Sequence, residues 1–346
     1  LWLSALERYR ATYSWSPNFG YQAVVTACEK RGISRAWDLS CLRRLLNGAE
    51  QVTRRTCEAF LDCTGLSSSV MMPSYGLAET CGGCLYNLEF STAFKPAGSI
   101  LRLDPASLGL GSRVLEAASD NATASEVVDL GIPTAGTSVR VQLSKDSGLA
   151  DEWTIGRIQI FGPTLTAGYV NLPAQTEEAF CKDGWFDTGD LGFMHGGRIA
   201  VTGRAKEQIN IRGANIYCYE VEEAIWRVDG VKPTFAAACG VEDAAKGTEA
   251  LAIFFVPTLD NFVPSADALG APFDAGSVRG RALLQEVRRA SAEKCGVAPL
   301  HVIPVPEAQF FKTTGGKIQR DAFRREFKQG VYDHLVGAVE IEGAAS

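Results

Sequence analysis

Residues 184–223 constrain the fold more than any other stretch, because a short segment combines paired carboxylates, an isolated arginine and a change in hydrophobic pattern. Asp187 and Asp190 lie on either side of a Thr-Gly pair, and Arg204 follows a glycine. Before residue 184 the chain has short apolar runs separated by glycines, whereas after residue 207 strand and helix patterns follow each other. We therefore expect a domain border inside this stretch.

The length of the chain fits two domains. Its 346 residues, of which 46% are hydrophobic, can bury more than one core. We expect an α/β fold with a large domain over residues 1–203, made of α/β sheets and a small β subdomain. A hinge over 204–206, a smaller α+β domain over 207–330 and a tail or linker over 331–346 would follow.

The first part of the chain has the pattern of an α/β sheet. Helices are expected over about 21–31 and about 52–61, and an apolar strand over 70–74. Leu45-Leu46-Asn47 precedes a glycine turn at Gly48-Ala49, and ligands bind at such strand ends in α/β sheets. Taken alone, however, this run is better explained as an ordinary strand-to-helix turn.

Residues 91–126 are rich in Ala, Ser, Gly and Asp and lack firm periodicity, so we expect a long surface excursion there. Alternating apolar and polar residues at 139–143 and 155–162 predict strands. Because Gly and Pro separate these strands, they are typical of a small β-rich subdomain.

The last part of the chain predicts a compact α+β domain. Its expected strands lie at about 208–211, 234–239, 251–256 and 300–303, and its expected helices at about 219–228, 279–295 and 321–327. The Pro/Asp/Ala-rich stretch 257–277 predicts a surface loop.

Composition narrows the possible partners. Lys plus Arg total 34 against 40 acidic residues, and no long basic run is present, so we expect no nucleic-acid partner. The longest apolar stretches, such as 250–256, are too short to span a bilayer, and Leu1 opens no secretory signal, which favours a cytoplasmic protein. Because the sequence has no initiator Met and opens on an amphipathic pattern, we expect it to begin inside a domain.

The ten cysteines are scattered, and many have apolar neighbours, which predicts reduced core thiols rather than a disulfide framework. Cys81 and Cys84 form a lone CxxC pair with no second pair and no nearby histidine. A zinc or redox site is therefore the less favoured interpretation of this pair.

A first candidate ligand-binding motif follows the strand at 70–74. Gly76 has no side chain, which leaves space for a planar ligand to lie on Tyr75. Glu79 offers a carboxylate four residues after Tyr75. Because Tyr-Gly turns are common, this motif is only moderately specific.

Further candidates lie downstream. One carboxylate of the Asp187 and Asp190 pair can accept both hydroxyls of a ribose diol, and Arg204 presents a fixed fork of donors to ribose or phosphate oxygens. Lys317 follows two glycines, but Ile318 replaces the Ser or Thr that a Walker A motif needs. Each motif has an ordinary alternative: an Asx turn for the Thr-Gly-Asp segment and a solvated helix face for the basic residues from Lys317 onwards.

In this order, these motifs resemble the adenylate-forming superfamily of acyl-CoA synthetases, peptide-synthetase adenylation domains and luciferases, over about residues 17–325. The resemblance is closest to fatty acyl-AMP ligases that serve polyketide and nonribosomal peptide synthases. It rests on Pro17 to Tyr21, Asn47 to Glu50, Tyr75 to Glu79, Asn215 to Tyr217, and Val302 to Pro304 with Lys317 to Arg320.

The resemblance implies a role for each candidate residue. Tyr75, with Gly76 beside it, and the Gly48-Ala49 turn would flank adenine, Glu79 would hold Mg²⁺, Asp190 would bind the ribose hydroxyls, Arg204 would contact ribose or phosphate, Lys206 would be the hinge residue, and Lys317 would be the catalytic lysine.

The resemblance also implies a reaction. A fatty acid would be activated by ATP and Mg²⁺ to an acyl-adenylate and then transferred to the phosphopantetheine thiol of an acyl carrier protein or downstream synthase module. Rotation of the second domain about Lys206 would withdraw Lys317 between these half-reactions. Two alternatives stay open: an acyl-CoA synthetase, which uses free CoA, and a noncatalytic remnant or docking module.

Two features depart from the family pattern. Family members carry a Ser/Thr/Gly-rich phosphate loop before the Tyr-Gly motif, and residues 1–70 contain no match to it. We therefore expect the sequence to start partway through the large N-terminal domain and, by itself, to form acyl-adenylate poorly. Arg157 stands where the family usually has Glu, and we expect it to matter for structure rather than catalysis.

Overall fold

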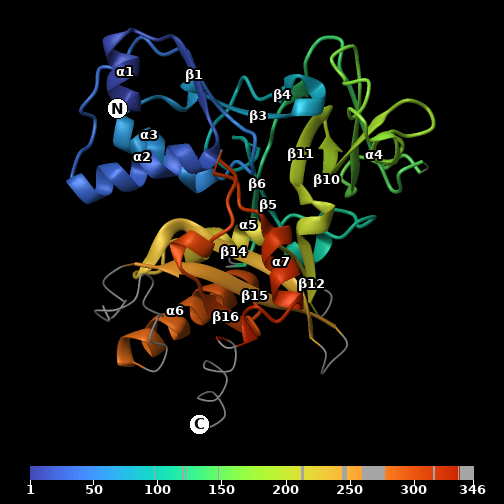
Figure 1. Cartoon of the computed structure of the whole chain (residues 1–346). Coiled ribbons are helices and arrows are strands. Elements are labelled where there is room, and N and C mark those ends of the chain that lie inside the picture. The colour runs from blue at the N-terminus through green and yellow to red at the C-terminus, as the bar shows by residue number, and fades with distance from the viewer. Residues whose placement is uncertain are drawn as a thin grey trace. The chain divides into compact units, whose positions relative to one another are not determined.

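The computed structural model (Figure 1) describes residues 1–335 apart from 97, 119–120, 122, 147, 212–213, 244–247, 259–276, 315 and 334. The chain forms two compact units, residues 1–206 and residues 207–346, and each is described by itself. Nearly all of the predicted loop 257–277 and most of the predicted tail 331–346 lie outside the described residues.

The first unit contains a mixed five-stranded sheet in the order β1-β2-β3-β4-β7. β1 (Tyr13–Ser16), β2 (Arg44–Asn47) and β3 (Met71–Leu77) are parallel, and β4 (Gly82–Tyr86) and β7 (Ile132–Pro133) pair antiparallel. The predicted strands at 45–47 and 70–74 are confirmed, and their pairing brings the turn after β2 beside β3.

Three helices bury apolar side chains in the core of this unit: α1 (Trp2–Arg8), α2 (Asn18–Arg31) and α3 (Arg54–Thr64). Both predicted helices are confirmed, but α2 begins earlier than expected. Its first residue, Asn18, is buried and donates from its side-chain amide to the hydroxyls of Thr53 and Thr56, at 3.4 and 3.3 Å. The Thr53 side chain also caps the first turn of α3.

Part of the predicted surface excursion 91–126 belongs to the core, so that prediction is wrong. β5 (Ile100–Leu103) pairs antiparallel with β6 (Ser125–Val128), and Ile100 and Val128 are buried in the same cluster as the helix residues. Each strand has only four residues. Because the two strands lie far apart in the sequence, no local period reveals their pairing.

The predicted β-rich subdomain is a four-stranded antiparallel sheet in the order β11-β10-β9-β8. Its strands are β8 (Ser138–Gln142), β9 (Gly156–Phe161), β10 (Phe186–His195) and β11 (Arg198–Arg204), and α4 (Pro173–Ala179) lies between β9 and β10 in the chain. The segment 187–190 is an irregular part of β10, and within it the Gly189 amide donates to Asp187 Oδ1 at 3.1 Å, as in the Asx turn given as the ordinary alternative.

The second unit contains a three-stranded sheet of β14 (Val231–Asp243), β15 (Thr248–Pro257) and β16 (His301–Pro304). A separate ribbon pairs β12 (Gln208–Ile211) with β13 (Ala214–Tyr217). The helices are α5 (Cys218–Ile225), α6 (Val278–Cys295) and α7 (Arg320–Lys328). All expected elements of this domain are present: β12 has the expected bounds, and the ends of the other elements are shifted. No helix in the described part of the chain has the length and hydropathy needed to cross a membrane.

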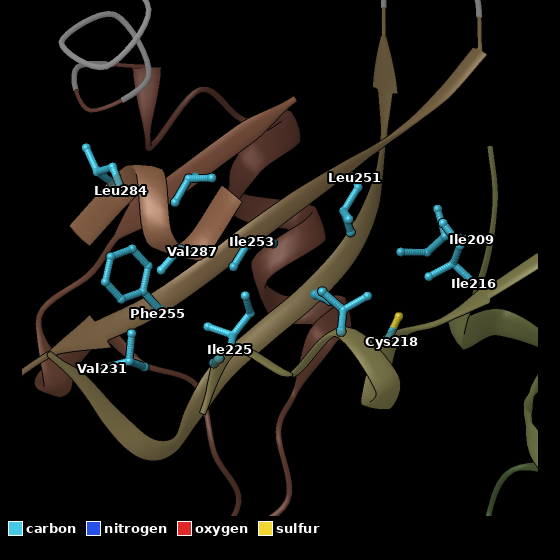
Figure 2. Close-up of a cluster of buried hydrophobic side chains, with 14 of the residues drawn as sticks. Ile209, Ile216, Cys218, Ile225, Val231, Leu251, Ile253, Phe255, Leu284 and Val287 are labelled. Atoms are coloured by element: carbon cyan, nitrogen blue, oxygen red, sulfur yellow. The ribbon is translucent and has the colours of Figure 1, made fainter. Parts of the chain in front are cut away.

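Alternate residues of the three-stranded sheet enter two different cores, as the period of a strand requires. Ile253 and Phe255 pack with Val287 of α6, and Figure 2 shows these side chains gathered in one cluster. Phe254 instead packs with Phe323 of α7, their ring centroids 4.9 Å apart. The sheet is therefore covered by helices on both faces.

The described start of the predicted tail also belongs to this second core. Tyr332 is only 2% exposed, and its ring centroid lies 5.1 Å from that of Phe254. A single aromatic residue after the last helix carries no periodic signal, so the sequence did not reveal this contact.

A buried carboxylate outside the predicted site connects several segments of the first unit. Asp129 accepts hydrogen bonds from Arg198 Nε at 2.6 Å and the backbone amide of Gly131 at 2.8 Å, and its Oδ2 lies 3.1 Å from Lys95 Nζ. Burial by itself would raise the pKa of Asp129, but the Arg198 and Gly131 hydrogen bonds outweigh it and hold the pKa below its usual value.

Because the pKa of Asp129 is lowered in the folded state, its contribution to stability is expected to depend on pH. A carboxyl whose pKa is lower in the folded than in the unfolded state, where it is about 3.9, stabilises the fold above the unfolded value. That contribution is lost as the pH falls through the folded pKa. Asp129→Asn is therefore expected to lower the urea unfolding midpoint strongly at neutral pH and much less at a pH of about 3. An equal loss at both pH values would contradict the role of the charge.

Candidate functional site

Three predicted site residues meet at one point of the first unit. The hydroxyl of Tyr75, on β3, donates a hydrogen bond to Asp190 Oδ2 at 2.5 Å. The other carboxylate oxygen of Asp190, on β10, lies 3.1 Å from Arg204 Nε at the end of β11. The Asp190 side chain is 7% exposed and that of Arg204 is 54% exposed. A nearly buried carboxylate thus faces a phenol and an accessible guanidinium.

A bulge in β10 presents Asp190 to these partners. Asp187 pairs with Gln159 and Leu191 with Arg157, so residues 188–190 lie opposite the single residue Ile158. Gly189 adopts a positive φ of 75°, which favours glycine at this position. Bulges are a common way to redirect a side chain beside a functional site, and the Thr-Gly pair in the sequence is the local cause of this one.

The electrostatics of Tyr75 favour hydrogen-bond donation. Burial, together with the negative charge of Asp190, raises the pKa of Tyr75 well above its usual value. The phenol therefore keeps its proton over the physiological range. Asp190, in turn, has two oxygens with several acceptor positions, which suits recognition of two adjacent hydroxyls.

Glu79 lies in a short 3₁₀ turn, Ala78–Thr80, directly after β3. Its Oε1 accepts a hydrogen bond from the hydroxyl of Tyr169 at 2.7 Å. Burial and this bond raise the pKa of Tyr169 to about 12, and the positive charge of Arg204 acts in the opposite direction. Tyr169 was not predicted as a site residue. The signal that could have identified it is the aromatic residue after the glycine in Ala167-Gly168-Tyr169.

Within the described residues, no three His, Cys, Asp or Glu side chains are grouped so that they could hold a metal ion by themselves. Glu79 is a single carboxylate, and Mg²⁺ is commonly held by one or two carboxylates together with water and substrate phosphates. Glu79 therefore fits the implied Mg²⁺ only as one ligand beside a bound nucleotide.

Cys84, the second cysteine of the CxxC pair, is buried. Burial raises the pKa of its thiol to about 11, as expected for a core thiol.

The two predicted glycines are required by close backbone packing. A Cβ on Gly48 would lie 2.5 Å from Ser74 Oγ, so the turn after β2 touches the residue before Tyr75. A Cβ on Gly76 would lie 1.9 Å from the carbonyl oxygen of Gly82 on β4. The space beside Gly76 is therefore filled by backbone rather than left open for a planar ligand. Ala49 has a positive φ of 66°, which completes the tight turn.

Lys317 lies in the second unit, with its side chain exposed to solvent. Its backbone is fixed by a small hairpin, because Thr313 N donates to the Lys317 carbonyl at 2.8 Å and Lys317 N donates to Thr313 Oγ1 at 3.1 Å. The side chain of Lys206 lies outside the described residues. The hinge role of Lys206 and the catalytic role of Lys317 stay predictions.

Comparisons with known proteins agree with the nucleotide interpretation. Residues 1–170 match the family model described as AMP-binding enzyme. The chain is 30% identical over 341 residues to the nonribosomal peptide synthetase btyA of Aspergillus terreus, an alignment that covers 95% of this chain and 32% of that protein. The chain thus spans about a third of the length of the curated relatives that it matches.

Solved structures extend this similarity. The adenylation, ketoreductase and pseudo-Asub multidomain structure of a keto acid-selecting nonribosomal peptide synthetase module matches 98% of this chain and 27% of its own, with 31% identity and a TM-score of 0.83. A structure from studies of the fatty acyl-adenylate ligases of E. coli and L. pneumophila matches 96% of this chain and 56% of its own, with 23% identity and a TM-score of 0.73. At that lower identity the similarity shows the fold, and the fatty acyl substrate stays a prediction.

The expected fold and the grouping of Tyr75, Asp190 and Arg204 agree with the family match. Residues 1–170 are thus similar to AMP-binding enzymes, and the fold of the chain is similar to that of a nonribosomal peptide synthetase module that contains an adenylation domain.

Proposed function

We propose that this chain binds the nucleotide in an enzyme that activates a carboxylic acid as an acyl-adenylate and passes the acyl group to a carrier-protein phosphopantetheine thiol. The observation that carries the proposal is the buried Asp190 carboxylate, held between the Tyr75 hydroxyl and the Arg204 guanidinium. In the proposed complex the ribose hydroxyls of the nucleotide replace one or both of these partners.

The chemistry of the first half-reaction joins two anions. A carboxylate oxygen of the acid attacks the α-phosphate of ATP, a new oxygen–phosphorus bond forms, and pyrophosphate leaves with the bonding electron pair. Mg²⁺ held in part by Glu79 would neutralise charge on the phosphates. The Lys317 ammonium would stabilise the charge that develops on the bridging oxygen, and preorganised positive charge is a dominant catalytic contribution in such reactions.

The substrate class follows the more similar relatives. We propose a 2-keto or amino acid, because the solved module that matches 98% of this chain at 31% identity is keto acid-selecting. The fatty acid expected from the sequence motifs is the alternative. Transfer to free CoA in place of a carrier protein is the alternative for the second half-reaction.

Acid-dependent exchange of labelled pyrophosphate into ATP, catalysed by the full-length gene product, tests this function. A panel of a 2-keto acid, an amino acid and a medium-chain fatty acid is expected to give the highest rate with one of the first two. A highest rate with the fatty acid would restore the fatty acyl assignment. No exchange with any acid, combined with retained binding of an acyl-adenylate analogue, would favour the noncatalytic alternative.

A further inference from the structure

We propose that Arg157 and Asp187 form a clamp that positions the bulge from which Asp190 projects, and that nucleotide affinity depends on this ion pair. The inference deepens the proposed function, on which its nucleotide part rests. Both residues act through the bulge rather than on the nucleotide itself, so both are positioning residues.

The clamp is bidentate and largely buried. Arg157 Nε lies 2.7 Å from Asp187 Oδ2, and Arg157 Nη2 lies 3.1 Å from Asp187 Oδ1. The Asp187 side chain is 2% exposed and the Arg157 side chain is 29% exposed. Paired hydrogen bonds between a guanidinium and a carboxylate fix both distance and orientation, so this contact restrains the backbone on which it stands.

The position of the clamp on the two strands gives it a specific role. Arg157 of β9 is opposite Leu191, at the end of the bulge, but its side chain reaches back to Asp187, at the start of the bulge. The ion pair therefore connects the two ends of residues 188–190. This geometry gives the positive charge at position 157 a structural reason, because its partner at position 187 is a carboxylate.

Other hydrogen bonds continue from the clamp to Asp190. The Gly189 amide donates to Asp187 Oδ1 at 3.1 Å, and the Asp190 amide donates to Thr188 Oγ1 at 3.1 Å. Thr188 Oγ1 itself donates to the Ile158 carbonyl at 2.8 Å. Loss of the Arg157 side chain leaves Asp187 without its cation and frees the start of this chain of bonds. The Asp190 oxygens then lose their fixed position relative to Tyr75 and Arg204.

Two measurements on the full-length gene product test the clamp, one with AMP and one without a ligand. Calorimetry is expected to give an AMP dissociation constant at least about tenfold higher for Arg157→Gln and for the charge reversal Arg157→Glu, since the loss of one hydrogen bond to a charged group has effects of this size. The swapped pair Arg157→Glu with Asp187→Arg is expected to recover part of the affinity, because it restores the ion pair but not the acceptor of the Gly189 amide. In the ligand-free protein, amide hydrogen exchange at residues 188–190 is expected to be faster in Arg157→Gln.

A control exists in the same unit. Arg10 Nη1 donates to Asp38 Oδ2 at 2.8 Å, and neither residue belongs to the bulge or to the strands beside it. Arg10→Gln should therefore leave the AMP affinity unchanged. Unchanged hydrogen exchange and unchanged affinity in Arg157→Gln would overturn the clamp. Faster exchange in Arg157→Gln with no AMP binding by any protein, wild type included, would refute the nucleotide function and leave the clamp standing.

Discussion

Replacing Lys317 with alanine is expected to lower acid-dependent ATP–pyrophosphate exchange by the full-length gene product about 10²- to 10³-fold, the usual effect of removing one preorganised group that stabilises developing charge. The Lys317 side chain is exposed, and its hairpin is held by backbone bonds to Thr313 that an alanine retains. The loss should therefore appear in the rate of exchange and not in the unfolding midpoint.

Lys328 provides the matched control for Lys317. It is also an exposed lysine of the second unit, at the end of α7. Lys328→Ala should exchange pyrophosphate at the wild-type rate. Equal exchange in wild type and Lys317→Ala would contradict the catalytic role of Lys317, whatever the behaviour of the control.

The second large effect is expected on stability, at a buried ion-pair network in the second unit. The Glu222 side chain is 1% exposed. Its carboxylate accepts hydrogen bonds from Arg320 Nε at 2.7 Å, from Arg320 Nη2 at 2.6 Å and from the Ala238 amide at 3.0 Å. Arg320 Nη1 lies 2.8 Å from Glu207 Oε2. The network thus joins the first residue of the unit, α5, β14 and the start of α7, directly after the Lys317 hairpin.

Arg320→Ala is expected to destabilise the second unit by about 3–5 kcal/mol, because breaking a buried pair leaves an uncompensated charge. Glu222→Gln combined with Arg320→Met is expected to cost less than Arg320→Ala alone, since neither charge then remains buried. Urea unfolding measures both. Arg289, which pairs with Glu286 and Glu293 on the exposed face of α6, is the control, and Arg289→Ala should have little effect. An equally small effect of Arg320→Ala would contradict the structural role of the network.

Local signals in the sequence predicted most of the regular elements. The helices α2 and α3 end at glycines, and the alternating residues of β8 and β9 were sufficient to place those strands. The predictions failed where the structure depends on contacts between residues far apart in the sequence. β5 and β6 are short strands that become core only by pairing with each other, and Tyr332 becomes core only by contact with Phe254. No local period carries either contact.

The candidate site was predicted in part for the same reason. Tyr75, Asp190 and Arg204 have chemical types that indicate nucleotide recognition, and the structure brings them together. The bulge that presents Asp190 depends on Arg157, a residue on another strand, and the hydrogen bond from Tyr169 to Glu79 joins residues 90 positions apart. Sequence motifs identify the reacting groups, whereas the groups that hold them in place become visible only in the fold.

Binding of a nonhydrolysable acyl-adenylate analogue, measured by calorimetry on the full-length gene product, tests the central claim most directly. Asp190→Asn keeps the shape of the side chain but removes the charge that would accept the ribose hydroxyls, and hydrogen bonds to charged groups contribute about 1.5–3 kcal/mol. The wild-type protein and the exposed-carboxylate control Asp183→Asn should bind the analogue with equal affinity, and Asp190→Asn should bind it at least about tenfold more weakly. Equal affinity of Asp190→Asn and Asp183→Asn, or no binding by the wild type, would contradict the assignment of this site.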